Sequence, residues 1–116
     1  RVDEWETVAA PSNVAQGIEA HPGRPLLLDC LTVWIGNLMH EEVDVDEHMS
    51  ALVECLTAAP GPLVVVSNEV GLGLVPDNPM ARRFRDYAGR LNQRVAAIAP
   101  RVVLVTAGIP LTLKDN

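Results

Sequence analysis

Residues 63–81 read L-V-V-V-S-N-E-V-G-L-G-L-V-P-D-N-P-M-A and carry the clearest structural pattern of the chain. A short β-branched run bounded by turn residues is typical of a buried parallel strand. The strand ends at Ser67, and Asn68 and Glu69 follow it directly. In open α/β sheets, ligands bind just beyond the carboxyl ends of such strands. We therefore expect Asn68 and Glu69 to lie at a ligand site.

The rest of the chain alternates between strand and helix patterns. Strands are predicted at 5–8, 25–30, 63–67 and 101–106, and helices at about 12–20, 31–40, 46–59 and 78–99. Asn78 is a good helix cap and Pro79 suits a first helical position. Residues Gly108 to Pro110 are expected to turn the chain after the last strand. This alternation predicts an α/β fold with a mostly parallel sheet flanked by helices and right-handed crossovers.

Composition narrows the class of protein. A length of 116 residues is about one small domain, and the net charge is −6, with acidic residues concentrated between Glu41 and Glu47. This charge argues against nucleic acid or an anionic membrane surface as the main partner. No apolar run approaches the ~18 residues of a membrane span, and no signal-peptide pattern is visible. The sequence predicts a soluble, cytoplasmic protein whose cysteines, Cys30 and Cys55, are reduced.

Several polar residues are candidates for a site. Asp29 ends the strand L-L-L-D, where a carboxylate either holds Mg²⁺ beside nucleotide phosphates or caps the helix that begins near Leu31. Asn68 and Glu69 either orient a hydroxyl nucleophile or sense a phosphate, or they tie down the glycine loop. Gly71 and Gly73 do not match the phosphate-binding pattern G-x-x-x-x-G-K-[ST], so their expected role is backbone conformation.

The arginine stripe of the long helix and Lys114 allow two interpretations each. The arginine stripe of the long helix either meets phosphates or a neighbouring subunit, or forms a solvated helix face, which is the more common case. This stripe consists of Arg82, Arg83, Arg85, Arg90 and Arg94. Lys114 either approaches a phosphate or is a solvated terminal lysine. No histidine has metal-ligand spacing or a triad neighbour, and both tryptophans, Trp5 and Trp34, are expected in the core.

Four segments, in order, carry a family resemblance. They are Trp5-Glu6-Thr7, the run L-L-L-D-C-L-T-V-W-I-G-N-L (residues 26–38), the run S-N-E-V-G-L-G-L-V-P (residues 67–76) with the arginine-rich helix after it, and V-T-A-G-I-P-L-T-L-K (residues 105–114). Together they resemble the bifunctional adenosylcobinamide kinase/adenosylcobinamide-phosphate guanylyltransferase of cobalamin (vitamin B12) biosynthesis.

The resemblance implies a P-loop fold with a RecA-like sheet and a transferase activity. Such enzymes phosphorylate the aminopropanol hydroxyl of adenosylcobinamide with a nucleoside triphosphate, ATP or GTP. They then transfer GMP from GTP to that phosphate through a guanylylated histidine, releasing pyrophosphate. The resemblance places Asp29, with Mg²⁺ bound directly or through water, and Arg1 at the nucleotide. Together with Asn68, Glu69, Gly71, Gly73, Arg82 and Lys114, which the residue patterns propose as lining the site, these form the predicted site. The resemblance also implies a homotrimer.

The resemblance also exposes departures. In the family, the phosphate loop and the nucleophilic histidine lie before the W-x-T segment. Residues 1–116 are therefore expected to form one α/β domain, which is the C-terminal portion of a larger P-loop domain. This portion is expected to lack the P-loop strand. Alone, such a piece is expected to be inactive and marginally stable. Ala9 stands where the family usually has a glutamate associated with guanine binding. The alternative is a non-catalytic remnant that acts as an oligomerisation or regulatory module.

Overall fold

The structure is a computed structural model that describes residues 5–10 and 12–116. The chain divides into two compact units, residues 1–68 and residues 69–116, and each is described by itself. Along the chain, three helices and two strands belong to the first unit, and one helix and two strands belong to the second. The alternation of strands and helices predicted from the sequence is therefore present, as an α/β architecture.

The first unit is built on a pair of parallel strands. Strand β1 (Leu26–Asp29) pairs with β2 (Leu63–Val66), so that Leu26 lies opposite Leu63 and Asp29 lies opposite Val66. Parallel neighbours need a crossover connection, and helices α2 (Leu31–His40) and α3 (Val45–Ala58) provide it. The predicted parallel sheet is present as this two-stranded pair, and both strands end at the same edge; the strand predicted at 101–106 is not part of it.

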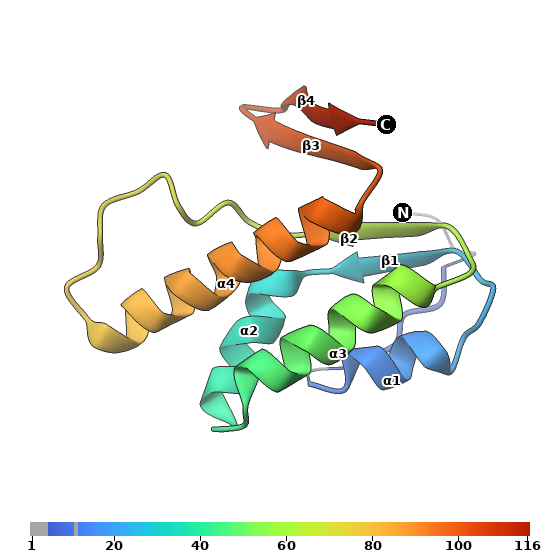
Figure 1. The fold of residues 1–116 in the computed structure, drawn as a ribbon, viewed down its shortest axis with the longest axis horizontal. Helices are drawn as coiled ribbons and strands as arrows, with labels where there is room; N and C mark the ends of the chain where they lie inside the picture. Colours follow the sequence, from blue (N-terminus) through green and yellow to red (C-terminus); the bar gives the residue numbers. More distant parts are fainter. Residues whose placement is uncertain (1–4, 11) are drawn as a thin grey trace. The chain divides into compact units, whose positions relative to one another are not determined.

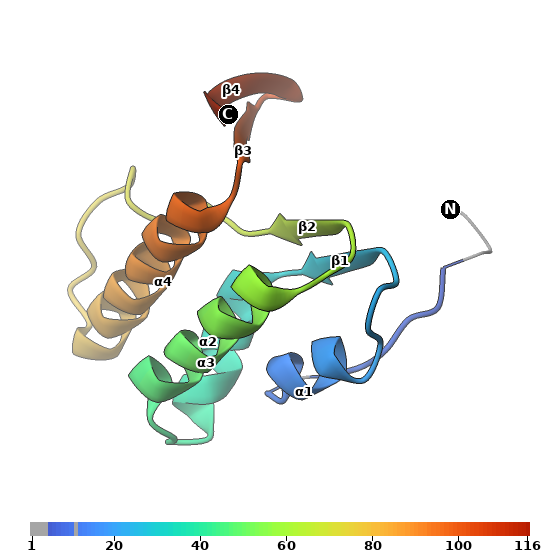
Figure 2. The same ribbon diagram turned by 45° about the vertical axis from the view of Figure 1, so that its right-hand side comes forward.

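Helices cover one face of this strand pair. Helix α1 (Val14–Glu19) contacts α3, α3 contacts α2, and all three run on the same side of β1 and β2 (Figures 1 and 2). The strand residues alternate accordingly between half-buried and exposed, as a sheet covered on one face requires. The core of the unit consists of Val14, Leu31, Trp34, Ile35, Leu38, Val45, Met49, Leu52 and Leu56.

Local sequence explains where α3 begins and ends. The side chain of Asp44 accepts a hydrogen bond from the backbone N–H of Glu47 at 3.0 Å, which satisfies one of the free donors of the first turn. Asp46 and Glu47 add negative charge where the helix dipole is positive. The helix ends at Ala58, just before the sequence Pro60-Gly61-Pro62, which cannot continue it.

The second unit begins with a loop and the long helix α4 (Pro79–Ile98). The carboxamide oxygen of Asn78 accepts hydrogen bonds from the N–H groups of Met80 and Ala81, at 2.8 and 3.3 Å. This side chain caps the helix, and Pro79 occupies its first position, where a missing N–H costs nothing. Both details agree with the prediction from the sequence.

The end of the chain differs from the prediction. Strand β3 (Arg101–Thr106) is followed by a fourth strand, β4 (Ile109–Asp115), and the two form an antiparallel hairpin. The turn is made by Ala107 and Gly108, which both have positive φ, the signature of a two-residue hairpin turn. The expected turn at Gly108 to Pro110 was therefore placed too late, because Pro110 lies in β4 opposite Val105.

The strand predicted at residues 5–8 is absent, since the structure gives these residues no regular secondary structure. Trp5, expected in the core, is 49% exposed. Trp34 is buried as expected, and its indole N–H donates a hydrogen bond to the carbonyl of Ser12 at 3.0 Å. Within the part of the chain that the structure describes, no helix is both long and apolar enough to cross a membrane.

Candidate functional site

Polar groups meet where β1 and β2 end. The amide of Asn68 donates a hydrogen bond to the hydroxyl of Thr32, with the two atoms 2.8 Å apart. The thiol of Cys30 lies 3.2 Å from the same hydroxyl. Asp29 immediately precedes this group, at the end of β1. The structure thus ties Asn68, after β2, to the first turn of α2, which follows β1.

Thr32 is a residue that sequence reasoning missed. Its side chain is buried, yet it carries a hydroxyl that bonds both to Asn68 and to Cys30. A buried hydroxyl needs such partners, because leaving it unsatisfied costs free energy. The sequence places Thr32 in the first helical turn after a strand that ends in Asp29, and this position could have indicated a site residue. A single threonine within a helix pattern does not distinguish itself from a structural residue.

Asp29 does not cap α2, so the capping interpretation of this residue is wrong. The residue at the cap position is Cys30, and it makes no side-chain capping hydrogen bond. The carboxylate of Asp29 is instead exposed at the strand end. Its charge is therefore accessible to a ligand.

A cavity of about 770 Å³ adjoins β1 and includes Asp29 in its lining. Consecutive residues 26–30 all line it, and further lining residues come from residues 5–10, α1 and α2. The lining is mostly apolar, with Trp5, Val8, Ile18, Val33 and Trp34 among its members. Concave, mostly apolar sites of this size with a few polar groups are typical of small-molecule pockets.

Charged groups also line this cavity. The carboxylate of Glu6 lies 3.9 Å from Nε2 of His21 and 3.7 Å from the guanidinium of Arg24. The other ring nitrogen of His21 is 2.9 Å from the carbonyl of Gly17. The pair of Glu6 with Arg24 is exposed, and exposed pairs of this kind contribute little stability. Ala9 lies in the same wall and adds no charge.

The second unit contains the glycine loop. The carboxylate of Glu69 accepts a hydrogen bond from the N–H of Gly71. The guanidinium of Arg85 donates to the carbonyls of Val70 and Gly71, at 3.2 and 3.1 Å. Glu69 therefore ties down its own loop, as one of its two interpretations required. A methyl group placed on Gly73 would meet no atom within 4 Å, so this glycine is not required by packing.

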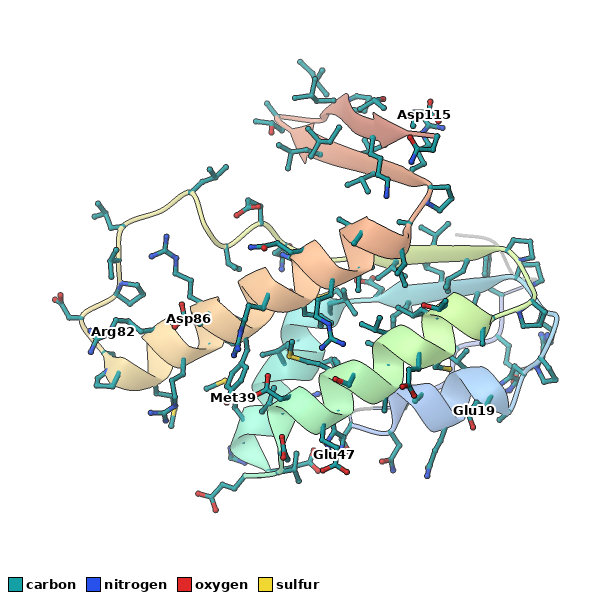
Figure 3. All side chains as sticks on the ribbon, viewed as in Figure 1. Glu19, Met39, Glu47, Arg82, Asp86 and Asp115 are labelled. Atoms are coloured by element: carbon teal, nitrogen blue, oxygen red, sulfur yellow. The ribbon has the colours of Figure 1, made fainter. Side chains whose placement is uncertain are left out.

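Two further basic candidates, Arg82 and Lys114, bind carbonyl groups. Arg82, at the start of α4 (Figure 3), donates to the carbonyls of Pro76 and Asp77 at 2.9 and 2.8 Å. The ammonium of Lys114 donates to the carbonyls of Ala96 and Ala97 at 2.9 and 3.1 Å. Those carbonyls belong to the last turns of α4, where a cation is favourable for the helix dipole.

The hydrogen bonds described above do not test two predicted parts of the site, Arg1 and the magnesium site. Arg1 lies outside the described residues. Among the described residues, no group of three or more His, Cys, Asp or Glu side chains could hold a metal ion by itself. The exposed Asp29 carboxylate fits a magnesium ion that takes most of its ligands from water and phosphate, as Mg²⁺ commonly does.

Comparisons with known proteins agree with the motifs along the chain. The family model described as "Cobinamide kinase / cobinamide phosphate guanyltransferase" matches residues 1–113. The bifunctional adenosylcobalamin biosynthesis protein CobP of Pseudomonas aeruginosa is 42% identical over 120 aligned residues, which cover 100% of this chain and 69% of that protein. The CobU proteins of Escherichia coli and Salmonella typhimurium are 37% and 39% identical, over 72% and 60% of their lengths and 98% and 80% of this chain. The chain therefore belongs to the cobinamide kinase / cobinamide phosphate guanyltransferase family.

Proposed function

We propose that this chain is the nucleotide- and substrate-positioning part of an enzyme that phosphorylates cobinamide and then transfers GMP from GTP to the phosphate. The family match over residues 1–113 supports this reaction class, as do relatives named as bifunctional adenosylcobalamin biosynthesis proteins. In phosphoryl and nucleotidyl transfer, the protein mainly positions phosphates and stabilises charge. The candidate residues supply carboxylate, amide and hydroxyl groups for positioning.

The observation that carries the proposal is the cavity whose lining includes the exposed Asp29 carboxylate. We assign it to the guanine nucleotide. The apolar walls suit the faces of a purine, whose N–H groups need acceptors at the edge of the ring. Ala9 offers no acceptor at the position where a glutamate was expected, so the remaining carboxylates in the lining, Glu6 and Asp29, are the candidates for that contact. Bound Mg²⁺ at Asp29 would neutralise phosphate charge.

We further propose that the phosphate loop and the nucleophilic histidine lie on polypeptide upstream of Trp5. Residues 1–116 would then complete one P-loop domain with a RecA-like sheet, in a cytoplasmic enzyme that assembles as a homotrimer. The alternative, a non-catalytic oligomerisation or regulatory module, is favoured by Ala9, which stands where the family usually has a glutamate, and mass spectrometry distinguishes the two.

The test is intact mass spectrometry after incubation with Mg²⁺ and GTP. The complete gene product is expected to gain the mass of one GMP, and the 116-residue chain alone is expected to gain none. A complete gene product that carries no adduct and does not phosphorylate cobinamide would establish the non-catalytic alternative.

The assignment of the cavity is tested by GTP binding. Asp29→Asn in the complete gene product removes the exposed charge and is expected to weaken GTP binding in Mg²⁺ roughly ten-fold, the scale of one charge-assisted contact. Asp86→Asn is the matched control, because Asp86 is an exposed carboxylate on α4 and does not line the cavity. Equal GTP affinity in the two variants would refute the assignment.

A further inference from the structure

A buried hydroxyl connects the ends of β1 and β2. Thr32 is 5% exposed, and its hydroxyl accepts a hydrogen bond from the Asn68 amide at 2.8 Å. The sulfur of Cys30, which lines the cavity beside β1, lies 3.2 Å from the same oxygen. Asn68 comes shortly after Val66, the residue that lies opposite Asp29 in the strand register. All of these residues belong to the first unit.

The polar character of Thr32 sets it apart on its side of α2. Burying a hydroxyl costs free energy unless the hydroxyl is hydrogen-bonded, and an apolar side chain of similar size would avoid this cost. Both partners of the Thr32 hydroxyl are side chains, so these bonds do not cap the first turn of the helix. The other buried residues of α2 are apolar, namely Leu31, Trp34, Ile35 and Leu38.

The bond to Thr32 fixes the carboxamide of Asn68. Asn68 is an exposed residue beyond a strand end, where an asparagine side chain ordinarily changes rotamer freely. A hydrogen bond to a buried hydroxyl restricts that freedom and turns the amino end of the carboxamide toward the protein. A side chain that is ordered before binding loses less entropy when a substrate arrives, and it positions a reacting group more accurately.

We infer that Thr32 is a positioning residue for phosphoryl transfer, which holds the Asn68 carboxamide so that its oxygen accepts a hydrogen bond from the cobinamide hydroxyl. This inference rests on the proposed function. The carboxamide oxygen has two lone pairs, so it can accept a hydrogen bond from a substrate hydroxyl in addition to one from a protein donor. A carboxamide is not a base at neutral pH, so it orients the hydroxyl without removing its proton.

The chemistry of the two transfers makes this role specific to the first of them. In the phosphorylation, the acceptor is a hydroxyl, which has a proton to donate to the Asn68 oxygen. In the GMP transfer, the acceptor is a phosphate, which is mostly ionised at neutral pH. Its negatively charged oxygens donate no hydrogen bond and are repelled by the carboxamide oxygen. The orientation of Asn68 is therefore expected to matter in the first transfer and not in the second.

The experiment compares the two transfers in the complete gene product. Thr32→Val removes the hydroxyl but keeps the shape of the side chain, and it is expected to lower kcat for cobinamide phosphorylation roughly ten-fold. The KM values, and kcat for GMP transfer to cobinamide phosphate, are expected to stay unchanged. Thr32→Ser keeps the hydroxyl and is expected to restore most of the lost rate. Thr57→Val is the matched control, because the Thr57 hydroxyl donates to the carbonyl of Val53 within α3 at 2.7 Å.

A double-mutant cycle tests whether Thr32 acts through Asn68. Asn68→Ala is expected to lower kcat for phosphorylation at least as far as Thr32→Val does. The protein that carries both substitutions is expected to match Asn68→Ala alone, because two residues that act through one contact have non-additive effects. Additive losses would mean that Thr32 acts by another route, and this result would overturn the inference.

The outcomes separate this inference from the function on which it rests. If the bond is purely structural, Thr32→Val lowers the urea midpoint of unfolding but leaves both kcat values of the folded enzyme unchanged. That result overturns the inference while the proposed function stands. An equal loss of rate in both transfers would indicate general damage to the site and also overturns the inference. If the wild-type gene product does not phosphorylate cobinamide, the proposed function and the inference fail together.

Discussion

At the scale of single residues, the surroundings of the Cys55 thiol lower its reactivity as a nucleophile. Partial burial and the nearby Glu19 carboxylate raise the pKa of Cys55 above its usual value, with burial the larger cause. The thiol also points at the carbonyl of Ala15, 3.7 Å away. Since the thiolate is the nucleophile, a raised pKa means fewer reactive molecules at any pH below it.

We therefore expect Cys55 to be alkylated slowly at neutral pH, with a rate that climbs as the pH rises toward the raised pKa. Glu19→Gln removes the smaller of the two causes and is expected to speed alkylation at pH 8 by roughly two- to three-fold. Iodoacetamide labelling followed by peptide mass spectrometry measures the rate. Cys30 in the same sample is the internal reference, and an equal acceleration at both cysteines would show that the fold, not the charge, had changed.

At the scale of elements, local chemistry allowed most of the secondary structure to be predicted. The bounds of α2 and the start of α4 follow from helical spacing and from the Asn78-Pro79 cap. Residues 109–114 do alternate between apolar and other side chains, as a strand does, but Pro110 disfavours a strand and β4 was missed. A hairpin turn at Ala107 is also unusual for a residue with a β-carbon.

The candidate site could be predicted only in part, for a similar reason. The strand-end rule directed attention to Asp29 and Asn68, and the structure places them where β1 and β2 end. The bond from Asn68 to Thr32 joins residues 36 positions apart, and no local pattern reports such a contact. The cavity beside β1 likewise arises from packing of residues 5–10 against distant elements.

One junction between elements gives a stability prediction. Gly61, in the turn from α3 to β2, lies so close to the entrance of β1 that an added Cβ would sit 2.8 Å from the carbonyl oxygen of Arg24. Backbone atoms cannot rotate away, so Gly61→Ala is expected to lower the free energy of unfolding by about 1–3 kcal/mol.

The matched control for this junction is Gly89→Ala in helix α4. A Cβ at Gly89 meets nothing within 4 Å, and alanine is a better helix former, so this variant is expected to gain about 0.5–1 kcal/mol. Urea unfolding followed by circular dichroism measures both. Equal effects of the two substitutions would mean that the close approach at Gly61 does not constrain the turn.

At the scale of the whole molecule, the uncovered face of the β1–β2 pair is the feature with the largest consequence. Leu27 and Val64 lie opposite each other in the register and are 52% and 60% exposed. Parallel strands in stable proteins are normally covered on both faces. The helices of the first unit cover only the other face (Figure 2), so within this unit the face is left open for burial by other polypeptide or by association.

We therefore expect the 116-residue chain, prepared alone, to self-associate as its concentration rises. Replacing both Leu27 and Val64 with threonine keeps side chains that suit a strand but makes the face polar, and should shift the chain toward monomer. Sedimentation velocity over a concentration series measures the change. Val43→Thr, in the loop before α3, is the control for a single exposed valine outside the sheet. The expectation is contradicted if the double variant associates as strongly as the unmodified chain and Val43→Thr also leaves the association unchanged. In that case the apolar strand face does not drive association, and the exposed hairpin residues of the second unit become the surface to test.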